Sequence, residues 1–360
     1  MLAPAAALIF GVAALVTWLV MPLVMRAARA VGAVDIPKEA KHVHRGVIPR
    51  WGGVGLTLGF VVAAGLAYLV HTWGWVPQPT DPEDWWRIEG VMLGVGVALV
   101  FGMLDDWRPM RPLPQLGFQL LLAGIAIWHV VWIEVFGNPL TSETAEFIVL
   151  PTWAAMAFTV FWIVGMMNTV NFLDGLDGLA GGVALIAALL FAWHAYSLGQ
   201  VTVALFALAL AGACLGFLPW NFHPARVFMG TAGAAVLGYG LATFAILAPA
   251  KVATALLILG LPILDVAWLV ITRTRRGQSP FQGSRDHLHH RLLDLGLSQR
   301  TIVLLFYAFA LIGGALAILL PIRVYKLYAI IVLAALGLLV LWALSRPALR
   351  ARLHRQAPDA

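Results

Sequence analysis

The chain consists of long apolar segments separated by short polar stretches, which is the pattern of a polytopic membrane protein. An apolar stretch of about 17 to 25 residues is long enough to cross a bilayer as a helix. Eleven segments meet this criterion: residues 2–25, 52–71, 88–104, 115–133, 147–167, 179–197, 201–218, 232–248, 252–272, 301–320 and 325–344. The pattern therefore predicts an all-α membrane protein with about eleven transmembrane helices.

Composition supports this interpretation. Of the 360 residues, 61% are hydrophobic and only 11% are charged, which is far more apolar than a soluble domain requires. The first segment is long and lacks an upstream positive cluster, so we expect a retained helix in place of a cleaved signal peptide.

The single cysteine, Cys214, lies inside an apolar segment, and no disulfide within the chain is expected.

The basic residues predict the orientation. The net charge of +6 could suggest a nucleic-acid partner, but 19 of the 23 Lys and Arg residues fall in alternate connections and in the tail. This asymmetry places the N-terminus outside and the C-terminus in the cytoplasm, and it argues against nucleic acid. We expect one membrane domain, 1–345, and a basic cytoplasmic tail, 346–360. The predicted cytoplasmic loops are 26–51, 105–114, 168–178, 219–231 and 273–300.

The most polar of these loops reads NTVNFLDGLDGLAGG over residues 168–182. Two amides, Asn168 and Asn171, and two carboxylates, Asp174 and Asp177, recur at every third position. Each would cost several kcal/mol in hydrocarbon, so we expect an aqueous or protein-lined site. Oxygen ligands interleaved with glycine suit Mg²⁺ and a phosphate held close to the backbone. A polar loop with helix-capping residues is the simpler alternative.

A second acidic pair, Asp105 and Asp106, closes the third apolar segment. Neighbours on a helix point about 100° apart, so the two carboxylates are expected to serve different partners. Carboxylates at a helix C-terminus oppose the helix dipole unless a positive group lies nearby. The alternative is a solvated helix end beside Arg108 and Arg111.

The loop 273–300 contains three histidines, His287, His289 and His290, next to Asp286. Their spacing does not match the i, i+4 pair of helical zinc sites. Together with the arginines of this loop they suit an anionic phosphate group, although the outlying arginines could contact lipid headgroups instead. A glycine-rich turn before residue 232 could bring backbone N–H groups to an anion, or could simply serve helix packing.

Five ordered motifs together resemble the polyprenyl-phosphate N-acetylhexosamine-1-phosphate transferases, in particular the bacterial undecaprenyl-phosphate GlcNAc-1-phosphate transferases of glycosyltransferase family 4. They are HRGVIPRWGG at 44–53, LDDWR at 104–108, NTVNFLDGLDGLAGG at 168–182, NFHPARVFMG at 221–230 and SPFQGSRDHLHHRLLDLGLS at 279–298. The resemblance implies transfer of N-acetylhexosamine-1-phosphate from a UDP-sugar to undecaprenyl phosphate, with release of UMP and a need for Mg²⁺, for which Mn²⁺ could substitute. It also implies a multi-pass protein of the bacterial plasma membrane with a cytoplasmic active site that initiates cell-wall or surface-polysaccharide synthesis, and it is compatible with a homodimer.

The resemblance assigns roles position by position. The catalytic residues would be Asp105, Asp106, Asp174, Asp177 and His287. Substrate binding would fall to Asn168, His289, His290, Arg285, His44 and Arg45. The metal ligands would be Asn171, Asp174 and Thr231.

Three positions depart from the family pattern, and each departure removes a charge. Thr231 stands where the family usually has Asp, Gln115 where Lys is usual, and Ser284 where Asp is usual. A hydroxyl is a weaker ligand for a hard divalent cation than a carboxylate. The alternative function is therefore a catalytically impaired member of this fold that acts as a lipid-phosphate-binding or scaffold protein. A transporter is disfavoured, because the ionisable clusters lie at one membrane face.

Overall fold

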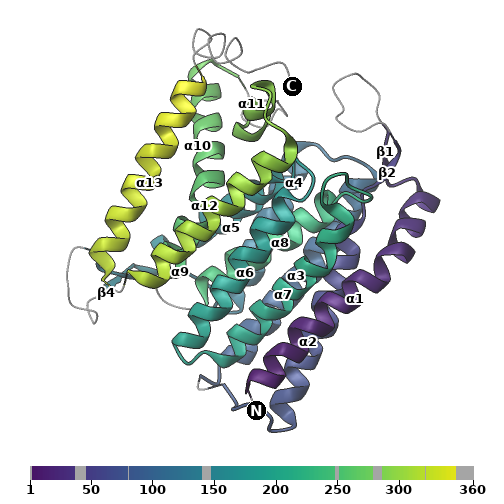
Figure 1. The fold of residues 1–360 in the computed structure, drawn as a ribbon. Coiled ribbons are helices and arrows are strands. Elements are labelled where there is room, and N and C mark those ends of the chain that lie inside the picture. The colour runs from purple at the N-terminus through teal and green to yellow at the C-terminus, as the bar shows by residue number, and fades with distance from the viewer. Residues whose placement is uncertain are drawn as a thin grey trace.

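The computed structural model describes residues 2–36, 46–79, 81–139, 147–247, 251–278, 286–320 and 322–345. This part of the chain contains thirteen helices (Figure 1). The first eight are α1 (Leu2–Val31), α2 (Gly52–Thr72), α3 (Asp84–Trp107), α4 (Pro112–Trp128), α5 (Thr152–Leu173), α6 (Leu179–Ser197), α7 (Val201–Asn221) and α8 (Gly230–Ile246). The others are α9 (Lys251–Ile258), α10 (Gly260–Arg275), α11 (Leu288–Asp294), α12 (Gln299–Leu319) and α13 (Arg323–Leu344).

The all-α prediction is confirmed, and each predicted apolar segment corresponds to one helix or to the α9–α10 pair. Within the described residues, eight helices are long and apolar enough to cross a membrane, and the α9–α10 pair could form a ninth span. The apolar helices α4 and α8 are shorter, at 17 residues each. The number of spans and their orientation stay predictions.

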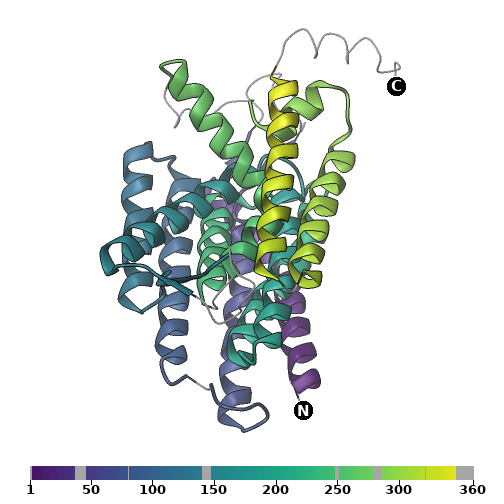
Figure 2. The ribbon, with the colours of Figure 1, turned by 90° about the vertical axis from the view of Figure 1, so that its left-hand side faces the viewer.

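Two of the expected segments differ from the observed helices. The segment 147–167 was predicted as one helix, but Phe147–Val149 form a strand and α5 begins only at Thr152. The segment 252–272 was predicted as one span, but α9 and α10 are bent by 81° at their junction. Pro262 has no N–H with which to bond the carbonyl of Ile258, so the helix breaks there. In Figure 2, α10 leans outward from the bundle.

The strands form two small hairpins, which the apolar pattern did not predict. The pair β1 (Val34–Asp35) and β2 (Ile48–Pro49) is antiparallel, and so is the pair β3 (Val135–Gly137) and β4 (Phe147–Val149). Figure 1 shows the first hairpin near the end of the bundle that carries α11, and β4 near the start of α13 at the other end.

Helix α8 forms the centre of the bundle, where it packs against α2, α3 and α5. All but two of its residues are buried. Small residues permit this close packing: a Cβ on Gly53 would lie 2.0 Å from the backbone nitrogen of Gly233, and one on Gly102 would lie 2.2 Å from the Cα of Ala232. Close backbone approach through small residues is typical of helix association in membranes.

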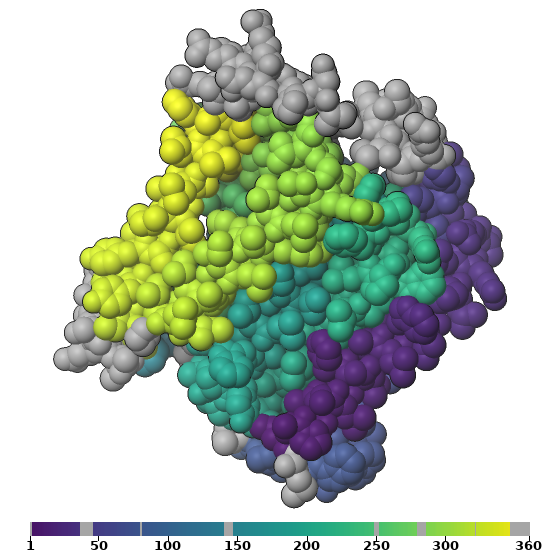
Figure 3. All heavy atoms as spheres, viewed as in Figure 1, coloured from purple at the N-terminus to yellow at the C-terminus, as the bar shows by residue number. Residues whose placement is uncertain are grey.

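The outer surface of the bundle is apolar, as the membrane prediction requires. Large hydrophobic side chains are exposed along the outer helices, for example Leu15 and Leu23 of α1 and Leu339 of α13. Figure 3 shows α13 and α1 along opposite edges of the molecule. An apolar surface of this extent would drive aggregation in water, but it is stable against lipid.

Candidate functional site

Asp106 joins the end of α3 to the beginning of α8. One carboxylate oxygen, Oδ1, accepts a hydrogen bond from the backbone N–H of Thr231 at 2.8 Å, and Oδ2 accepts one from Ala232 at 3.1 Å. The carboxylate therefore caps the positive end of the α8 dipole. A carboxylate at the C-terminus of α3 is unfavourable for the dipole of α3, and the N-terminus of α8 supplies the positive group that offsets this.

Asp105, its neighbour, bonds a different set of donors. Its Oδ1 accepts from the backbone N–H of Met110 at 2.8 Å and from the side-chain amide of Gln115 at 3.1 Å. Its Oδ2 accepts from the hydroxyl of Thr231 at 2.7 Å. All three donors are neutral, so they fix the carboxylate without neutralising its charge.

Gly230 brings three segments together at the start of α8. Its φ angle is +71°, and a Cβ at this position would lie 2.1 Å from the carbonyl oxygen of Arg50 and 2.5 Å from Oδ2 of Asp106. Only glycine fits this backbone conformation and this space. The Arg50 guanidinium is close enough to attract the carboxylates of both Asp106 and Asp174.

Asp174 caps the C-terminus of α5 and faces the same cluster. Enclosure by protein raises the pKa of its carboxyl well above the ordinary value, and repulsion from Asp106 and Asp177 acts in the same direction. Attraction to Arg50 and a hydrogen bond from the backbone N–H of Gly230 oppose the rise in pKa. Part of the Asp174 residue stays exposed to solvent. A cation placed beside it would favour the charged form.

The turn between α5 and α6 is held from three sides. Oδ2 of Asp177 accepts from the backbone N–H of Ala225 at 3.1 Å and lies 2.8 Å from Nδ1 of His223. The backbone N–H of Gly178, which has a φ of +82°, donates to Asn221, and its carbonyl accepts from the hydroxyl of Tyr307. Helices α7 and α12 thus fix the acidic turn.

The predicted histidines lie against this turn. His287 precedes α11, and its Nδ1 lies 2.9 Å from Oδ2 of Asp265 in α10. Oδ1 of Asp265 also accepts from the backbone N–H of Leu288. The rings of His287 and His289 stack with centroids 5.6 Å apart. Asp265 therefore fixes the position of the His287 ring and of Leu288, the first residue of α11.

His289 is almost fully buried, and a Cβ on Gly175 would lie 2.3 Å from its Nε2. Within the described part of the chain, this buried Nε2 has no hydrogen-bond partner. Burial lowers the pKa of His289 well below its ordinary value, and the neighbouring His290 and His287 add to the shift. The ring is therefore neutral at neutral pH.

The structure places the two predicted amides differently. Asn168 and Asn171 belong to the last turns of α5, not to a loop. The side chain of Asn168 exchanges hydrogen bonds with Gln119 of α4 and donates to the carbonyl of Val164. Asn171 is exposed. Three other predicted positions, His44, Arg45 and Arg285, lie outside the described residues, as does Ser284.

A continuous set of contacts thus links Asp105, Asp106, Thr231, Asp174 and His289 at one end of the bundle. Sequence reasoning did not include Arg50 or Asp265 in the site. A signal existed for Asp265, because it is the only charged residue of the apolar segment 252–272. Arg50 lies close to the two glycines of IPRWGG, but the sequence analysis used it only as one of the basic loop residues that predict the orientation.

The donors in this cluster fit a hard cation. Among the described residues, no three His, Cys, Asp or Glu side chains converge as they would around a metal bound by protein alone. Mg²⁺, however, commonly uses one or two carboxylates and completes its coordination with waters and substrate phosphates. The enclosed carboxyl of Asp174, beside two like charges, is a suitable ligand of this kind.

Comparison with known proteins agrees with this arrangement. A family model described as glycosyl transferase family 4 matches residues 88–249. A probable undecaprenyl-phosphate N-acetylglucosaminyl 1-phosphate transferase of Bacillus subtilis is 34% identical in an alignment of 317 residues that covers 86% of this chain and 84% of the relative. A decaprenyl-phosphate N-acetylglucosaminephosphotransferase of Mycobacterium tuberculosis (strain H37Rv) is 33% identical over 84% of this chain and 79% of its own length.

A more distant relative, a phospho-N-acetylmuramoyl-pentapeptide-transferase of Moorella thermoacetica, is 32% identical over 83% of this chain and 93% of its own length. The helical membrane fold and its one-sided polar site define a membrane-embedded enzyme. The chain belongs to glycosyl transferase family 4.

Proposed function

We propose that the protein transfers N-acetylglucosamine-1-phosphate from UDP-GlcNAc to undecaprenyl phosphate and releases UMP. The main support is the convergence of Asp105, Asp174, Arg50 and His289 at one end of a membrane fold. Both substrates are anions at the reacting phosphates, and transfer between them depends on positioning and on positive groups that offset the charge of the transition state. The similarity to named transferases over most of the chain supports the same reaction.

In this reaction, an oxygen of the lipid phosphate attacks the phosphorus that bears the sugar. A new phosphorus–oxygen bond forms, and the bond from that phosphorus to UMP breaks, so that UMP leaves with the electron pair. We assign the orientation of the acceptor phosphate to Asp105, because the two oxygens of its carboxylate are held by three neutral donors. As a fixed carboxylate it can also accept the proton that the acceptor phosphate carries.

The donor diphosphate is assigned to Arg50 and His289. Arg50 offers a cation, and the buried Nε2 of His289 offers a hydrogen-bonding atom with no other partner among the described residues. A neutral imidazole can donate this hydrogen bond when its proton is on Nε2. Asp265 keeps His287 in place next to it.

Mg²⁺ fits as the cofactor, with Asp174, Asn171 and Thr231 as the oxygen donors and Mn²⁺ as a substitute. When bound, it would neutralise charge on the diphosphate and on the departing UMP. Thr231 already donates its hydroxyl hydrogen to Asp105, so its oxygen lone pairs stay available to a cation.

The neutral substitutions do not favour the alternative of binding without turnover. Gln115 and Thr231 both donate hydrogen bonds to Asp105, so they maintain the position of this carboxylate. The expected location is the bacterial plasma membrane, with this end of the bundle facing the cytoplasm, where UDP-sugars are made. A homodimer is compatible with this function.

Release of UMP from purified protein, undecaprenyl phosphate, UDP-GlcNAc and Mg²⁺ tests the proposal. We expect UMP from the unmodified chain and a loss of at least about a hundredfold in Asp105→Asn. Folding of the variant is checked by its thermal unfolding midpoint. The absence of UMP with UDP-GlcNAc and with other UDP-N-acetylhexosamines, from protein that is folded, would contradict the proposal.

A further inference from the structure

Helix α11 carries two of the three histidines of the site, yet it is only seven residues long. An isolated helix shorter than about 12 residues is marginal in water, so α11 depends on the rest of the protein for its stability. Asp265 of α10 holds the beginning of α11 through His287 and Leu288. Figure 1 shows α11 at the same end of the molecule as the last turns of α10 and α13, and a second support comes from α13.

Arg291, in the middle of α11, makes this second connection. Its side chain is buried, with the residue only 7% exposed. Nε donates to the backbone carbonyl of Asp286 at 2.6 Å, and Nη1 donates to the hydroxyl of Ser345 at 2.5 Å. Nη1 also donates to the carbonyl of Leu341 in α13, at 3.4 Å. The guanidinium therefore joins α11 to the C-terminal end of α13.

The hydroxyl of Ser345 is the point at which three helices meet. It donates its hydrogen to the carbonyl of Leu341 at 2.6 Å. It accepts from Arg291 of α11 and, at 3.2 Å, from the indole N–H of Trp268 in α10. A hydroxyl has one hydrogen to donate and two lone pairs, so these three bonds use its full capacity. Ser345 thus connects α10, α11 and α13.

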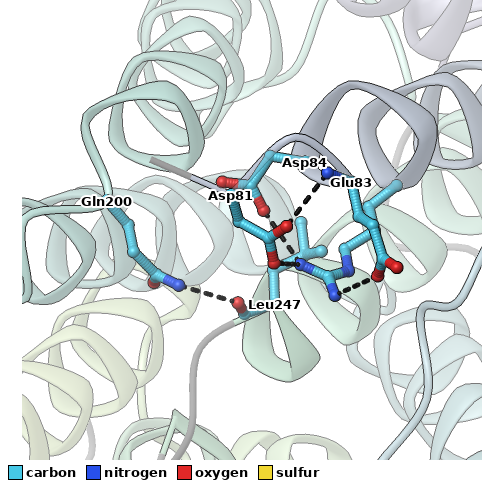
Figure 4. Close-up of polar contacts among 6 residues, drawn as sticks. Asp81, Glu83, Asp84, Gln200 and Leu247 are labelled. Atoms are coloured by element: carbon cyan, nitrogen blue, oxygen red, sulfur yellow. Dashed lines mark hydrogen bonds and ion pairs between the residues drawn. The ribbon is translucent and has the colours of Figure 1, made fainter. Parts of the chain in front are cut away.

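A second arginine, Arg87 at the other end of the bundle, is bonded differently. Its guanidinium pairs with three carboxylates: Asp81 at 2.6 Å, Glu83 at 2.8 Å and Asp84 at 3.1 Å (Figure 4). The three bonds of Arg291 described above end on neutral oxygens instead. A planar guanidinium can direct Nε and Nη1 to different partners, which the single nitrogen of a lysine cannot reproduce. The geometry of Arg291, more than its charge, therefore holds α11.

We propose that Arg291 is a positioning residue, which fastens α11 to α13 and so keeps His289 buried against the acidic turn. The backbone supports this link: Arg291 lies two residues after His289, and its N–H bonds the carbonyl of His287 at 3.0 Å. The consequence for catalysis rests on the proposed function, in which Nε2 of His289 bonds the donor diphosphate. The C-terminal end of α13, where no site residue was predicted, then belongs to the framework of the site.

Modification of His289 by diethylpyrocarbonate, measured by mass spectrometry on the purified full chain, tests the positioning. A buried imidazole reacts only when the structure opens locally, so His289 should react slowly in the unmodified protein. Arg291→Lys keeps the positive charge but loses the paired bonds, and the rate at His289 should rise about tenfold or more. Ser345→Ala should raise the rate by a smaller factor, because the carbonyls of Asp286 and Leu341 stay available to Arg291.

Two matched variants serve as controls. Arg87→Lys changes the arginine of Figure 4, and Ser197→Ala removes a hydroxyl that donates to the carbonyl of His194 at the end of α6. Neither should change the rate at His289. His71, which is fully buried at the other end of the bundle, reports global unfolding in every variant.

Steady-state kinetics test the consequence for the reaction. In Arg291→Lys, KM for UDP-GlcNAc should rise about three- to tenfold, the effect of one displaced hydrogen bond. KM for undecaprenyl phosphate should not change, because the acceptor is assigned to Asp105. A simple loss of folded protein would lower the rate and leave both KM values unchanged.

The outcomes separate this role from the alternatives. Equal rates at His289 in Arg291→Lys and Arg87→Lys would overturn the positioning role. A higher KM for undecaprenyl phosphate would also overturn it, because it would indicate that Arg291 contacts the acceptor. If His71 reacts faster in Arg291→Lys, that variant has unfolded, and Ser345→Ala decides. An unmodified chain that releases no UMP would contradict the proposed function, while the rates at His289 would still decide how α11 is held.

Discussion

The hydroxyl of Thr231 donates a hydrogen bond of 2.7 Å to the carboxylate of Asp105, although the two residues are 126 positions apart. Gln115 donates to the other oxygen of the same carboxylate. The two departures that the resemblance implies at these positions thus touch one group. One departure replaces an acid and the other a base, so together they leave the net charge around Asp105 unchanged.

This relationship predicts energetic coupling between the two positions. Thr231→Asp alone would add a carboxylate beside Asp105, and repulsion between like charges should lower the rate of UMP release about tenfold or more. Gln115→Lys in the same protein should recover most of that loss, because the added cation lies next to Asp105. The rates of the four proteins in a double-mutant cycle give the coupling energy, expected at about 1 to 3 kcal/mol. Effects that add within about 0.5 kcal/mol would refute the coupling.

Asp265 is expected to act by positioning His287. Asp265→Asn removes the charge that orients this ring, and kcat should fall about 10- to 100-fold, as for other groups that orient a functional histidine. KM for UDP-GlcNAc should change less if the histidine acts mainly in the transition state. Asp294→Asn is the control, since Asp294 is an exposed carboxylate on the neighbouring α11. Equal kinetics in both variants would exclude a positioning role.

Gly175 is expected to tolerate no side chain. In Gly175→Ala the added Cβ would lie 2.3 Å from Nε2 of His289, so the ring must move out of its buried position. UMP release should then fall at least about tenfold. Gly165→Ala in α5 serves as the control, because a Cβ there meets nothing within 4 Å. A fully active Gly175→Ala protein would show that the position of His289 is unimportant.

The lowered pKa of His289 predicts a contribution to acid sensitivity. In the unfolded chain this histidine takes up a proton near its ordinary pKa of 6.5, whereas the buried ring stays neutral to lower pH. The unfolded state therefore binds more protons below pH 6.5, and the free energy of unfolding decreases as pH falls through this range. For one titrating group, each pH unit lowers the free energy of unfolding by about 1.4 kcal/mol at most.

The measurement is the thermal unfolding midpoint at pH 7.5 and at pH 5.5. The decrease on acidification should be smaller in His289→Gln than in the unmodified protein, because the variant lacks this titrating group. An identical decrease in the two proteins would mean that protonation of His289 does not oppose folding.

Much of the helical framework was predictable, because the length and apolarity of a membrane helix are local properties. The segment 179–197 coincides with α6. The break between α9 and α10 was missed even though Gly260 and Pro262 mark it. The continuous apolar run led to the prediction of a single span despite these two helix-breaking residues.

The acidic residues of the site were also predictable, since carboxylates are rare in an apolar chain. Their partners were not, because each partner comes from a distant segment. Nothing in the sequence near Asp106 indicates that its carboxylate meets the first turn of α8, and nothing near Gly175 indicates His289. The burial of His289 could not be predicted for the same reason, since it arises only from packing between α11 and the α5–α6 turn.

The contact between Asp106 and α8 changes how a mutational scan of this enzyme should be interpreted. Both oxygens of this carboxylate accept hydrogen bonds from the first turn of α8, the most central helix. Substitution of Asp106 therefore destabilises the helix that positions the neighbouring groups of the site. A screen that records product alone would classify Asp106 together with the residues that carry out the chemistry. Only a parallel measurement of the amount of folded protein can distinguish a residue that stabilises the fold from one that takes part in the reaction.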